Sequence, residues 1–228
     1  MNAEYLENIW NRKKNIKFVY KKWWNSIANY MKNNDIVLEI GCGNGFFYEY
    51  LKKHKKVRYI GIDASKDNIY LARKKGNYFI LGSAERLPFK SFCIDVIVGI
   101  DVLHHLNFNK AIKEASRVLK NNGILLAVEP NKTKFNTFLT KIFRFHEDYT
   151  KYPSIGDIKE VMEKNHFDVI EIEVRDSLIY PLSGGFSRKN LIPQKFIGFI
   201  DFFDEKLLSK LKFLCWKFII KARKVDLK

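Results

Sequence analysis

Three glycines at alternate positions form the stretch of this sequence that is best suited to hold a small ligand. Gly41, Gly43 and Gly45 follow an apolar, β-favouring run and precede a helical pattern over 46–53, which predicts a strand, a tight turn and a helix. Glycine permits positive φ and close approach of a ligand to the backbone. Glu39, two residues before the first glycine, would repel a pyrophosphate but suits a ligand that carries an ammonium or sulfonium charge.

This spacing resembles the first motif of the class I S-adenosylmethionine-dependent methyltransferases, acidic-x-G-x-G-x-G. Dinucleotide-binding folds use G-x-G-x-x-G instead. The resemblance implies S-adenosyl-L-methionine as cofactor, and a purely structural turn or a different nucleotide site is the alternative. The cofactor-binding residues that it implies in the turn are Glu39, Gly41, Cys42, Gly43 and Gly45.

A second carboxylate ends the predicted strand 57–63. Asp63, at the carboxyl end of a second parallel strand, is placed to accept both ribose hydroxyls of an adenosine. In the methyltransferases that the sequence resembles, this position is the ribose acid, and Ala64 follows it. The alternative is that Asp63 or Ser65 only caps the predicted helix 66–75.

The segment after the short predicted strand 79–81 is expected to meet the adenine. The family often has acid-Ala-x-x-Leu-Pro-Phe here, and this chain has Ser83, Ala84 and Glu85 followed by Arg86 and Leu-Pro-Phe. Ser83 stands where the acid is common, so its hydrogen bond to the adenine amino group is expected to be weaker than that of a carboxylate. Glu85 is a partial substitute.

Two histidines follow the predicted strand 94–101. The resemblance places Ile100 and Asp101 at the methionine end of the cofactor, and many small-molecule methyltransferases carry a Leu-His-His-Leu segment after them. His104 and His105 are therefore catalytic candidates, because a histidine there could accept a proton from a hydroxyl nucleophile. Packing within a helix is the alternative, since methyl transfer needs mainly alignment and a base is optional.

Alternating strands and helices must position these residues. Five predicted strands that alternate with helices give a doubly wound parallel sheet of the α/β class, and ligands bind at the carboxyl ends of its strands. Strands predicted over 167–178 and 213–222 complete the sheet. The family resemblance implies a Rossmann-like seven-stranded sheet, mostly parallel, with an antiparallel seventh strand.

The composition of the 228 residues fits one α/β domain, since 46% are hydrophobic. Neither a signal-peptide pattern nor an apolar run of spanning length is present, so we expect a cytoplasmic protein, with association at the periphery of a membrane as a further option. The three cysteines are widely spaced and form no C-x-x-C pair, so no disulfide framework and no metal site are expected.

The net charge of +16 suggests an anionic partner, either nucleic acid or a membrane. Lysine far outnumbers arginine, however, which indicates a compositional bias, and the excess is concentrated in residues 1–34 and 186–228. Nucleic-acid binding is therefore an option that we do not favour. The sequence does not predict the oligomeric state.

The terminal segments and one insertion lie outside the motifs. Residues 1–34 are expected to form a helical cap on the methyltransferase domain 35–228, although the helix predicted over 4–32 could simply pack on the sheet. Residues 131–153 form an insertion at the ligand end of the sheet, which suggests a lid or a substrate-binding element. Candidate substrate-binding residues are His146 and Tyr149 in the insertion and Phe186 in a later Gly-Gly loop.

The segment 191–212 is amphipathic, rich in phenylalanine and interspersed with lysine. Such a segment could lie on a membrane surface or hold a lipid-like substrate. It could equally pack against the sheet or against a second subunit.

The function expected from these patterns is methyl transfer from S-adenosylmethionine to a small-molecule or lipid-linked acceptor. No Asn/Asp-Pro-Pro-Tyr/Phe segment follows the fourth predicted strand, which argues against methylation of the exocyclic amine of adenine or of glutamine. An RNA methyltransferase that uses the basic terminal segments is one alternative. A cofactor-binding regulator without catalysis is another.

Overall fold

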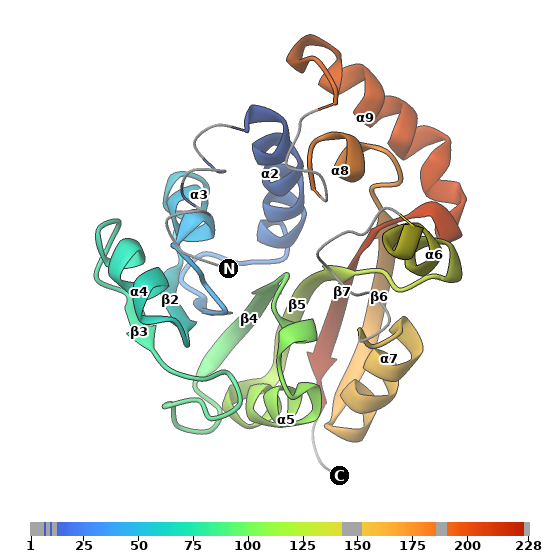
Figure 1. Ribbon diagram of the computed structural model, residues 1–228. Helices are drawn as coiled ribbons and strands as arrows, with labels where there is room; N and C mark the ends of the chain where they lie inside the picture. Colours follow the sequence, from blue (N-terminus) through green and yellow to red (C-terminus); the bar gives the residue numbers. More distant parts are fainter. Residues whose placement is uncertain (1–6, 8–9, 11–12, 143–151, 186–190, 226–228) are drawn as a thin grey trace.

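The computed structural model describes residues 7, 10, 13–142, 152–185 and 191–225. Seven strands form one sheet (Figure 1): β1 Ile36–Ile40, β2 Arg58–Asp63, β3 Phe79–Leu81, β4 Ile94–Ile100, β5 Leu119–Pro130, β6 Phe167–Arg175 and β7 Lys217–Lys224. Their order across the sheet is β3-β2-β1-β4-β5-β7-β6. The first five strands along the chain pair in parallel, as the alternating sequence pattern predicts.

The described helices are α2 Lys14–Ala28, α3 Phe46–His54, α4 Lys66–Arg73, α5 Phe108–Val118, α6 Lys134–Ile142, α7 Ile155–Lys164, α8 Ile179–Leu182 and α9 Ile197–Lys206. The hydrophobic core on one face includes α2, α3 and α4, and the core on the other face includes α5 and α7. The central strands are buried on both faces because their side chains alternate: Val96 and Val98 belong to the first core, and Ile97 belongs to the second.

The last strand is inserted between two others. β7 runs antiparallel to β5 on one side and to β6 on the other. The sequence-based expectation of an antiparallel seventh strand is therefore confirmed, although β7 begins at Lys217 and not at 213. Residues Lys212–Leu214 form a 3-10 turn ahead of it.

Helix α2 explains part of the amphipathic N-terminal pattern. Its apolar residues Ile16, Val19, Trp23 and Ile27 recur at three- and four-residue intervals, and all are buried in the first core. Trp24 is buried with them. The helix ends at Ala28, short of the predicted residue 32, and its tryptophans pack on the sheet as the alternative interpretation expected.

Three other segments differ in detail from the expectation. Residues Leu103–His105 form a 3-10 turn, not part of a helix, and α5 begins afterwards behind the N-cap Asn107, whose side chain accepts a hydrogen bond from the Lys110 N–H. The insertion contains α6. The Phe-rich segment 191–212 forms α9 between short 3-10 turns.

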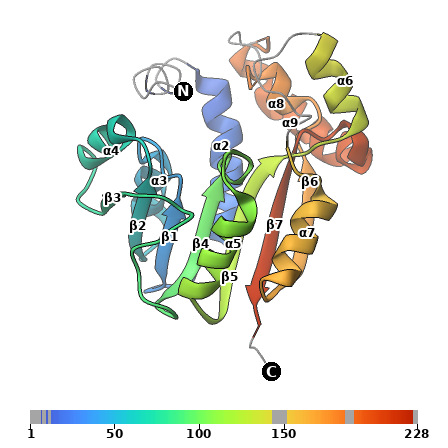
Figure 2. The same ribbon diagram turned by 60° about the horizontal axis from the view of Figure 1, so that its bottom comes forward.

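The carboxyl ends of β4 and β5 point towards the end of the molecule that carries α2, α6 and α9 (Figure 2). Ligand sites of parallel α/β sheets lie at this end. Among the described residues, no helix combines the length and the apolar character needed to cross a bilayer.

Candidate cofactor site

The glycine turn leaves β1 and enters α3 through three residues with positive φ. Gly41, Gly43 and Gly45 have φ values of 66°, 50° and 76°. A Cβ on Gly41 would lie 2.2 Å from the Val102 side chain, and one on Gly45 would lie 2.7 Å from Phe79, so these two positions are filled by the protein itself. A Cβ on Gly43 would meet nothing within 4 Å. The turn therefore opens to a ligand at Gly43.

Alanine substitutions at Gly41 and Gly43 should have different effects, on the stability of the fold at Gly41 and on ligand binding at Gly43. Gly41→Ala is expected to destabilise the fold by about 1–3 kcal/mol because the new methyl overlaps Val102. Gly43→Ala should cost only about 1–2 kcal/mol for its left-handed backbone, yet weaken binding of S-adenosylhomocysteine at least about 10-fold, because its methyl fills the open side of the turn. Thermal unfolding and titration calorimetry on both variants test this. Normal affinity in Gly43→Ala would contradict it.

Asp63 joins the end of β2 to the glycine turn. One of its carboxylate oxygens, Oδ2, accepts the Gly43 N–H at 2.9 Å. The other, Oδ1, accepts the Ser65 N–H at 2.9 Å and the Asn68 side-chain amide at 3.1 Å. Ser65 in turn caps α4, and the exposed Ala64 lies in the bend between them. Helix capping and ligand binding are thus compatible, since a carboxylate has lone pairs for about four hydrogen bonds.

Glu39 lies beneath the turn, where its side chain is buried and accepts a hydrogen bond from the Tyr59 hydroxyl. Burial raises the pKa of Glu39 to about 8, helped by the neighbouring Asp63 carboxylate. Burial also raises the pKa of the Cys42 thiol, so Cys42 acts as a small packed residue of the turn. The carboxyl of Glu39 is therefore largely protonated near neutral pH, so it does not present the negative charge that the sequence suggested for a sulfonium ligand.

The raised pKa of Glu39 makes stability depend on pH. Between the ordinary carboxyl value of 4.5 and about 8, the folded protein holds a proton on Glu39 that the unfolded chain has lost. The free energy of unfolding should therefore fall as pH rises through this window, by at most about 1.4 kcal/mol per pH unit from this group. Denaturant unfolding at pH 6 and pH 8 measures the slope. The neutral variant Glu39→Gln should flatten it, and an unchanged slope would be the contrary result.

The loop after β3 holds the three residues that were expected near the adenine. The Ser83 hydroxyl accepts the Glu85 N–H at 3.1 Å, and Ala84 is buried in the second core. One carboxylate oxygen of Glu85 accepts the Asn107 N–H at 2.8 Å. Ser83 is exposed, while Glu85 is tied to the start of α5. Their adenine contacts stay a prediction.

Asp101 follows β4 and the half-buried Ile100, and it joins three distant parts of the chain. Its carboxylate pairs with the ammonium of Lys217 on β7 and accepts a hydrogen bond from Tyr20 on α2 at 3.1 Å. Lys217 is buried, and its ammonium lies 4.7 Å from the centre of the Tyr180 ring. The side chain of Asp101 is thus committed to this ion pair, and its expected place beside the methionine end stays a prediction.

His104 is held by a carboxylate that the sequence did not single out. Its Nδ1 lies 2.6 Å from Oε2 of Glu129, a buried residue near the end of β5. Glu129 also accepts the backbone N–H groups of Val102 and Leu103, which fixes the 3-10 turn. A hydrogen bond donated by Nδ1 to the carboxylate leaves Nε2 as the ring nitrogen that could accept a proton. His105 is exposed, with a pKa lowered by partial desolvation and by the neighbouring His104.

Sequence signals for the missed residues were weak but present. Glu129 is an acid at the end of the apolar strand β5, and Lys217 is a cation that opens the strand β7. A charge in a buried strand needs a partner, so each of these residues indicates a buried hydrogen bond or ion pair.

Three predicted substrate-binding residues are not described by the structure. His146, Tyr149 and Phe186 lie outside the described residues. Within the described part of the chain, no cluster of metal-ligating side chains occurs, and the sequence predicted no metal. The N-terminal segment does reach the glycine turn: the Asn44 side chain donates to Glu7 at 3.0 Å, and the Trp10 ring stacks on Phe46.

Residues 38–127, which include the glycine turn, Asp63 and His104, match the family described as the methyltransferase domain. These 90 of the 228 residues are similar to that family. The chain is 32% identical over 126 residues to the tRNA (carboxymethyluridine(34)-5-O)-methyltransferase of Arabidopsis thaliana, covering 52% of this chain and 30% of that protein. It is 38% identical over 104 residues to the ubiquinone biosynthesis O-methyltransferase of Pelagibacter ubique, covering 42% of each.

The similarity in fold extends beyond residues 38–127. The solved structure of the geranyl diphosphate C-methyltransferase of Streptomyces coelicolor A3(2) is similar to this one with a TM-score of 0.66 and 14% sequence identity. The aligned region covers 90% of this chain and 79% of that protein. The chain spans about half or less of the length of the curated relatives it matches. S-adenosylmethionine is the cofactor that the glycine spacing implies, and the open position at Gly43 together with the Asp63 carboxylate fits it.

Proposed function

We propose that this chain transfers the methyl group of S-adenosylmethionine to a lipid-linked or other small apolar acceptor. The observation that carries the proposal is the convergence of the open turn at Gly43, the Asp63 carboxylate and the Glu129–His104 pair at the carboxyl ends of neighbouring strands. When bound, the cofactor supplies an electrophilic methyl group on a sulfonium. The acceptor class is supported by the exposed aromatic side chains of α6 and α9, which lie at the same end of the sheet.

His104 is the proposed proton acceptor for a hydroxyl nucleophile. The Glu129 carboxylate orients its ring and stabilises the imidazolium that would form. His104→Gln should lower kcat about 100-fold or more while the affinity for S-adenosylhomocysteine stays unchanged. His105→Gln, which changes the adjacent exposed ring, is the matched control. If His104→Gln were as active as His105→Gln, His104 would have a packing role alone.

RNA is the second candidate acceptor. The relative from Arabidopsis thaliana is named for a tRNA modification, and the net charge of +16 suits phosphate contacts. Binding to RNA would then fall steeply with rising salt.

One experiment separates these candidates. The protein is incubated with methyl-labelled cofactor and a fractionated cell extract, and the label is followed into lipid, RNA, protein and small metabolites. Label in the lipid or small-molecule fraction is the expected result. Label in RNA would replace the proposal by the second candidate. Tight cofactor binding with no label in any fraction would indicate a regulator without catalysis.

A further inference from the structure

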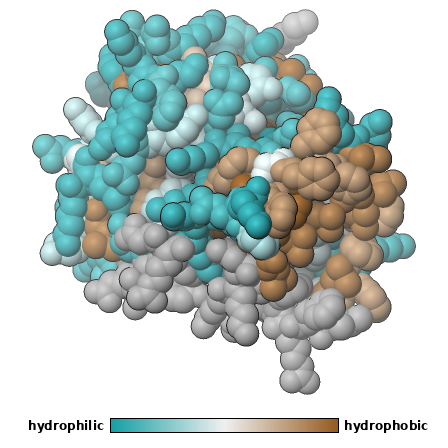
Figure 3. All heavy atoms as spheres, turned by 90° about the horizontal axis from the view of Figure 1, so that it is seen from above, coloured by the Kyte–Doolittle hydropathy of each residue, from teal (hydrophilic) through white to brown (hydrophobic). Residues whose placement is uncertain are grey.

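One side of the molecule exposes a cluster of large apolar side chains, which we call the Phe-rich surface. In the view of Figure 3 hydrophobic atoms gather on one side of the molecule. On α9, Phe199 and Phe202 are 72% and 61% exposed, and on α6 Phe138 is 59% exposed. The Phe135 ring of α6 lies 6.0 Å from Phe213, which links α6 to the 3-10 turn Lys212–Leu214 that follows α9. The residues of the surface are Phe135, Phe138, Phe196, Phe199, Phe202, Phe203, Leu207, Leu211 and Phe213.

The inner face of α9 packs against the protein and so holds the helix with its phenylalanines exposed. Ile197 is buried, and Ile200 packs against the first core. Asp204 is buried and accepts the N–H groups of Ser177, Leu178 and Ile179 at the start of α8, at 2.8–3.1 Å. The phenylalanines are therefore held outwards by an anchored helix, and exposed apolar patches of this kind usually mark an interaction site.

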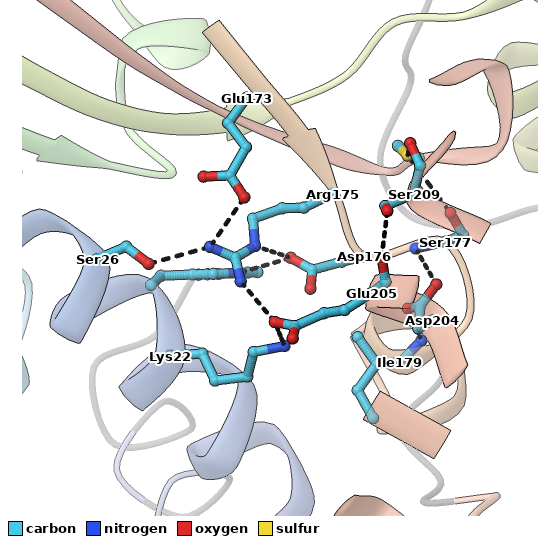
Figure 4. Close-up of polar contacts among 12 residues, drawn as sticks. Lys22, Ser26, Glu173, Arg175, Asp176, Ser177, Ile179, Asp204, Glu205 and Ser209 are labelled. Carbon is cyan, nitrogen blue, oxygen red and sulfur yellow. Dashed lines mark hydrogen bonds and ion pairs between the residues drawn. The ribbon is translucent and has the colours of Figure 1, made fainter. Parts of the chain in front are cut away.

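The acidic side chains of this segment contact the rest of the protein, whereas its lysines are exposed. All three acids between residues 191 and 214 are occupied by the rest of the protein: Asp204 by the α8 N–H groups, and Asp201 and Glu205 by ion pairs with Lys22 of α2. Glu205 also pairs with Arg175 at 3.4 Å (Figure 4). The lysines of the segment, Lys195, Lys206, Lys210 and Lys212, are exposed. The outer side thus combines phenylalanine with cations.

A basic hollow adjoins the Phe-rich surface. It has a volume of about 460 Å³ and shares Phe138 with the surface. Its lining includes Lys132, Lys134, Lys141, Thr137 and Ser154. Most of its lining is apolar, and Lys132 and Ser154 donate to the Tyr152 carbonyl and to Asp157. The hollow therefore adds apolar surface beside the exposed Lys134 and Lys141, which suit the phosphate of a lipid headgroup.

We propose that the Phe-rich surface docks on an anionic lipid bilayer. The aromatic side chains would enter the boundary between headgroups and acyl chains, and the surrounding lysines would contact lipid phosphates. This inference rests on the proposed function for the identity of the acceptor. The helices α6 and α9, which carry the surface, lie at the end of the sheet where the strands β4 and β5 end (Figure 2). Docking would place the site at the membrane from which a lipid-linked acceptor arrives.

Vesicle co-sedimentation of the full chain tests the proposal without using activity. Binding should be at least about 10-fold stronger to vesicles with phosphatidylglycerol than to pure phosphatidylcholine, and weaker at high salt. Phe199→Ser/Phe202→Ser should reduce it at least about 10-fold. Tyr70→Ser/Tyr78→Ser changes two equally exposed rings on and near α4 and should not, with unfolding temperature and S-adenosylhomocysteine affinity confirming that each variant is folded.

Charge variants give a second comparison. Lys195→Glu/Lys206→Glu/Lys210→Glu should abolish the preference for anionic vesicles. Lys113→Glu/Lys159→Glu/Lys164→Glu makes the same change in net charge on α5 and α7 and should retain it. Failure of the unaltered protein to bind anionic vesicles would overturn the proposal, as would a dimer in light scattering that the phenylalanine variants disrupt without any vesicle binding. Vesicle binding with label found only in RNA would keep the docking and reject the lipid acceptor.

Discussion

Asp63→Ala is expected to weaken S-adenosylhomocysteine binding about 100-fold or more. A hydrogen bond to a charged carboxylate contributes about 1.5–3 kcal/mol, and the ribose would lose this acceptor. The change also frees the Gly43 and Ser65 N–H groups that Asp63 now accepts, so the turn itself would be less ordered. Titration calorimetry measures the affinity.

A ligand analogue separates the direct contact from the loosened turn. The 2′,3′-dideoxy form of S-adenosylhomocysteine lacks both ribose hydroxyls. It should bind the unaltered protein weakly, and Asp63→Ala should reduce its affinity far less than that of the parent ligand. Asn68→Ala removes one neighbour of the carboxylate and serves as a control that should bind nearly normally. Equal losses for both ligands would assign Asp63 to the architecture of the turn only.

Asp101→Ala should be the most destabilising single substitution among those considered. It leaves the buried Lys217 ammonium without its carboxylate, and breaking a buried ion pair typically costs about 3–5 kcal/mol. For a chain of this length each 1 kcal/mol lowers the unfolding temperature by about 2–4 °C. A fall of roughly 10 °C in calorimetry is expected.

A second substitution distinguishes the ion pair from lost packing. Adding Lys217→Met to Asp101→Ala removes the buried charge, so most of the lost stability should return. Glu160→Ala breaks the exposed pair with Lys164 on α7 and should change stability by no more than about 1 kcal/mol. No recovery in the double variant would show that the charge of Lys217 is not what Asp101 balances.

Local patterns sufficed for the cofactor turn and the central strands. The glycines and Glu39 lie within seven consecutive residues, and the buried strands are continuous apolar runs, so their structure follows from neighbours along the chain. The family resemblance places His104 on the helix that follows the fourth strand, but it lies in the short 3-10 turn Leu103–His105 ahead of α5. Its conformation depends on Glu129, 25 residues away, whose carboxylate holds the 3-10 turn.

Long-range partners could not be predicted from spacing. Asp101 and Lys217 are separated by 116 positions, and the residues around each one do not indicate its partner. Segment 191–212 was predicted to be amphipathic, but which charges face inwards depends on Lys22 and Arg175 from other elements. Tertiary packing determines such choices after the secondary structure has formed.

The placement of β7 has a consequence for biosynthesis. Among the described strands, β6 pairs with the sheet through β7 alone, and β7 is synthesised about 40 residues after β6. Until β7 is made, β5 is an open edge of the nascent sheet and β6 has no strand to pair with. Lys217, the counterion of Asp101, belongs to β7, so synthesis of this strand completes both the sheet and the ion pair at the carboxyl end of β4.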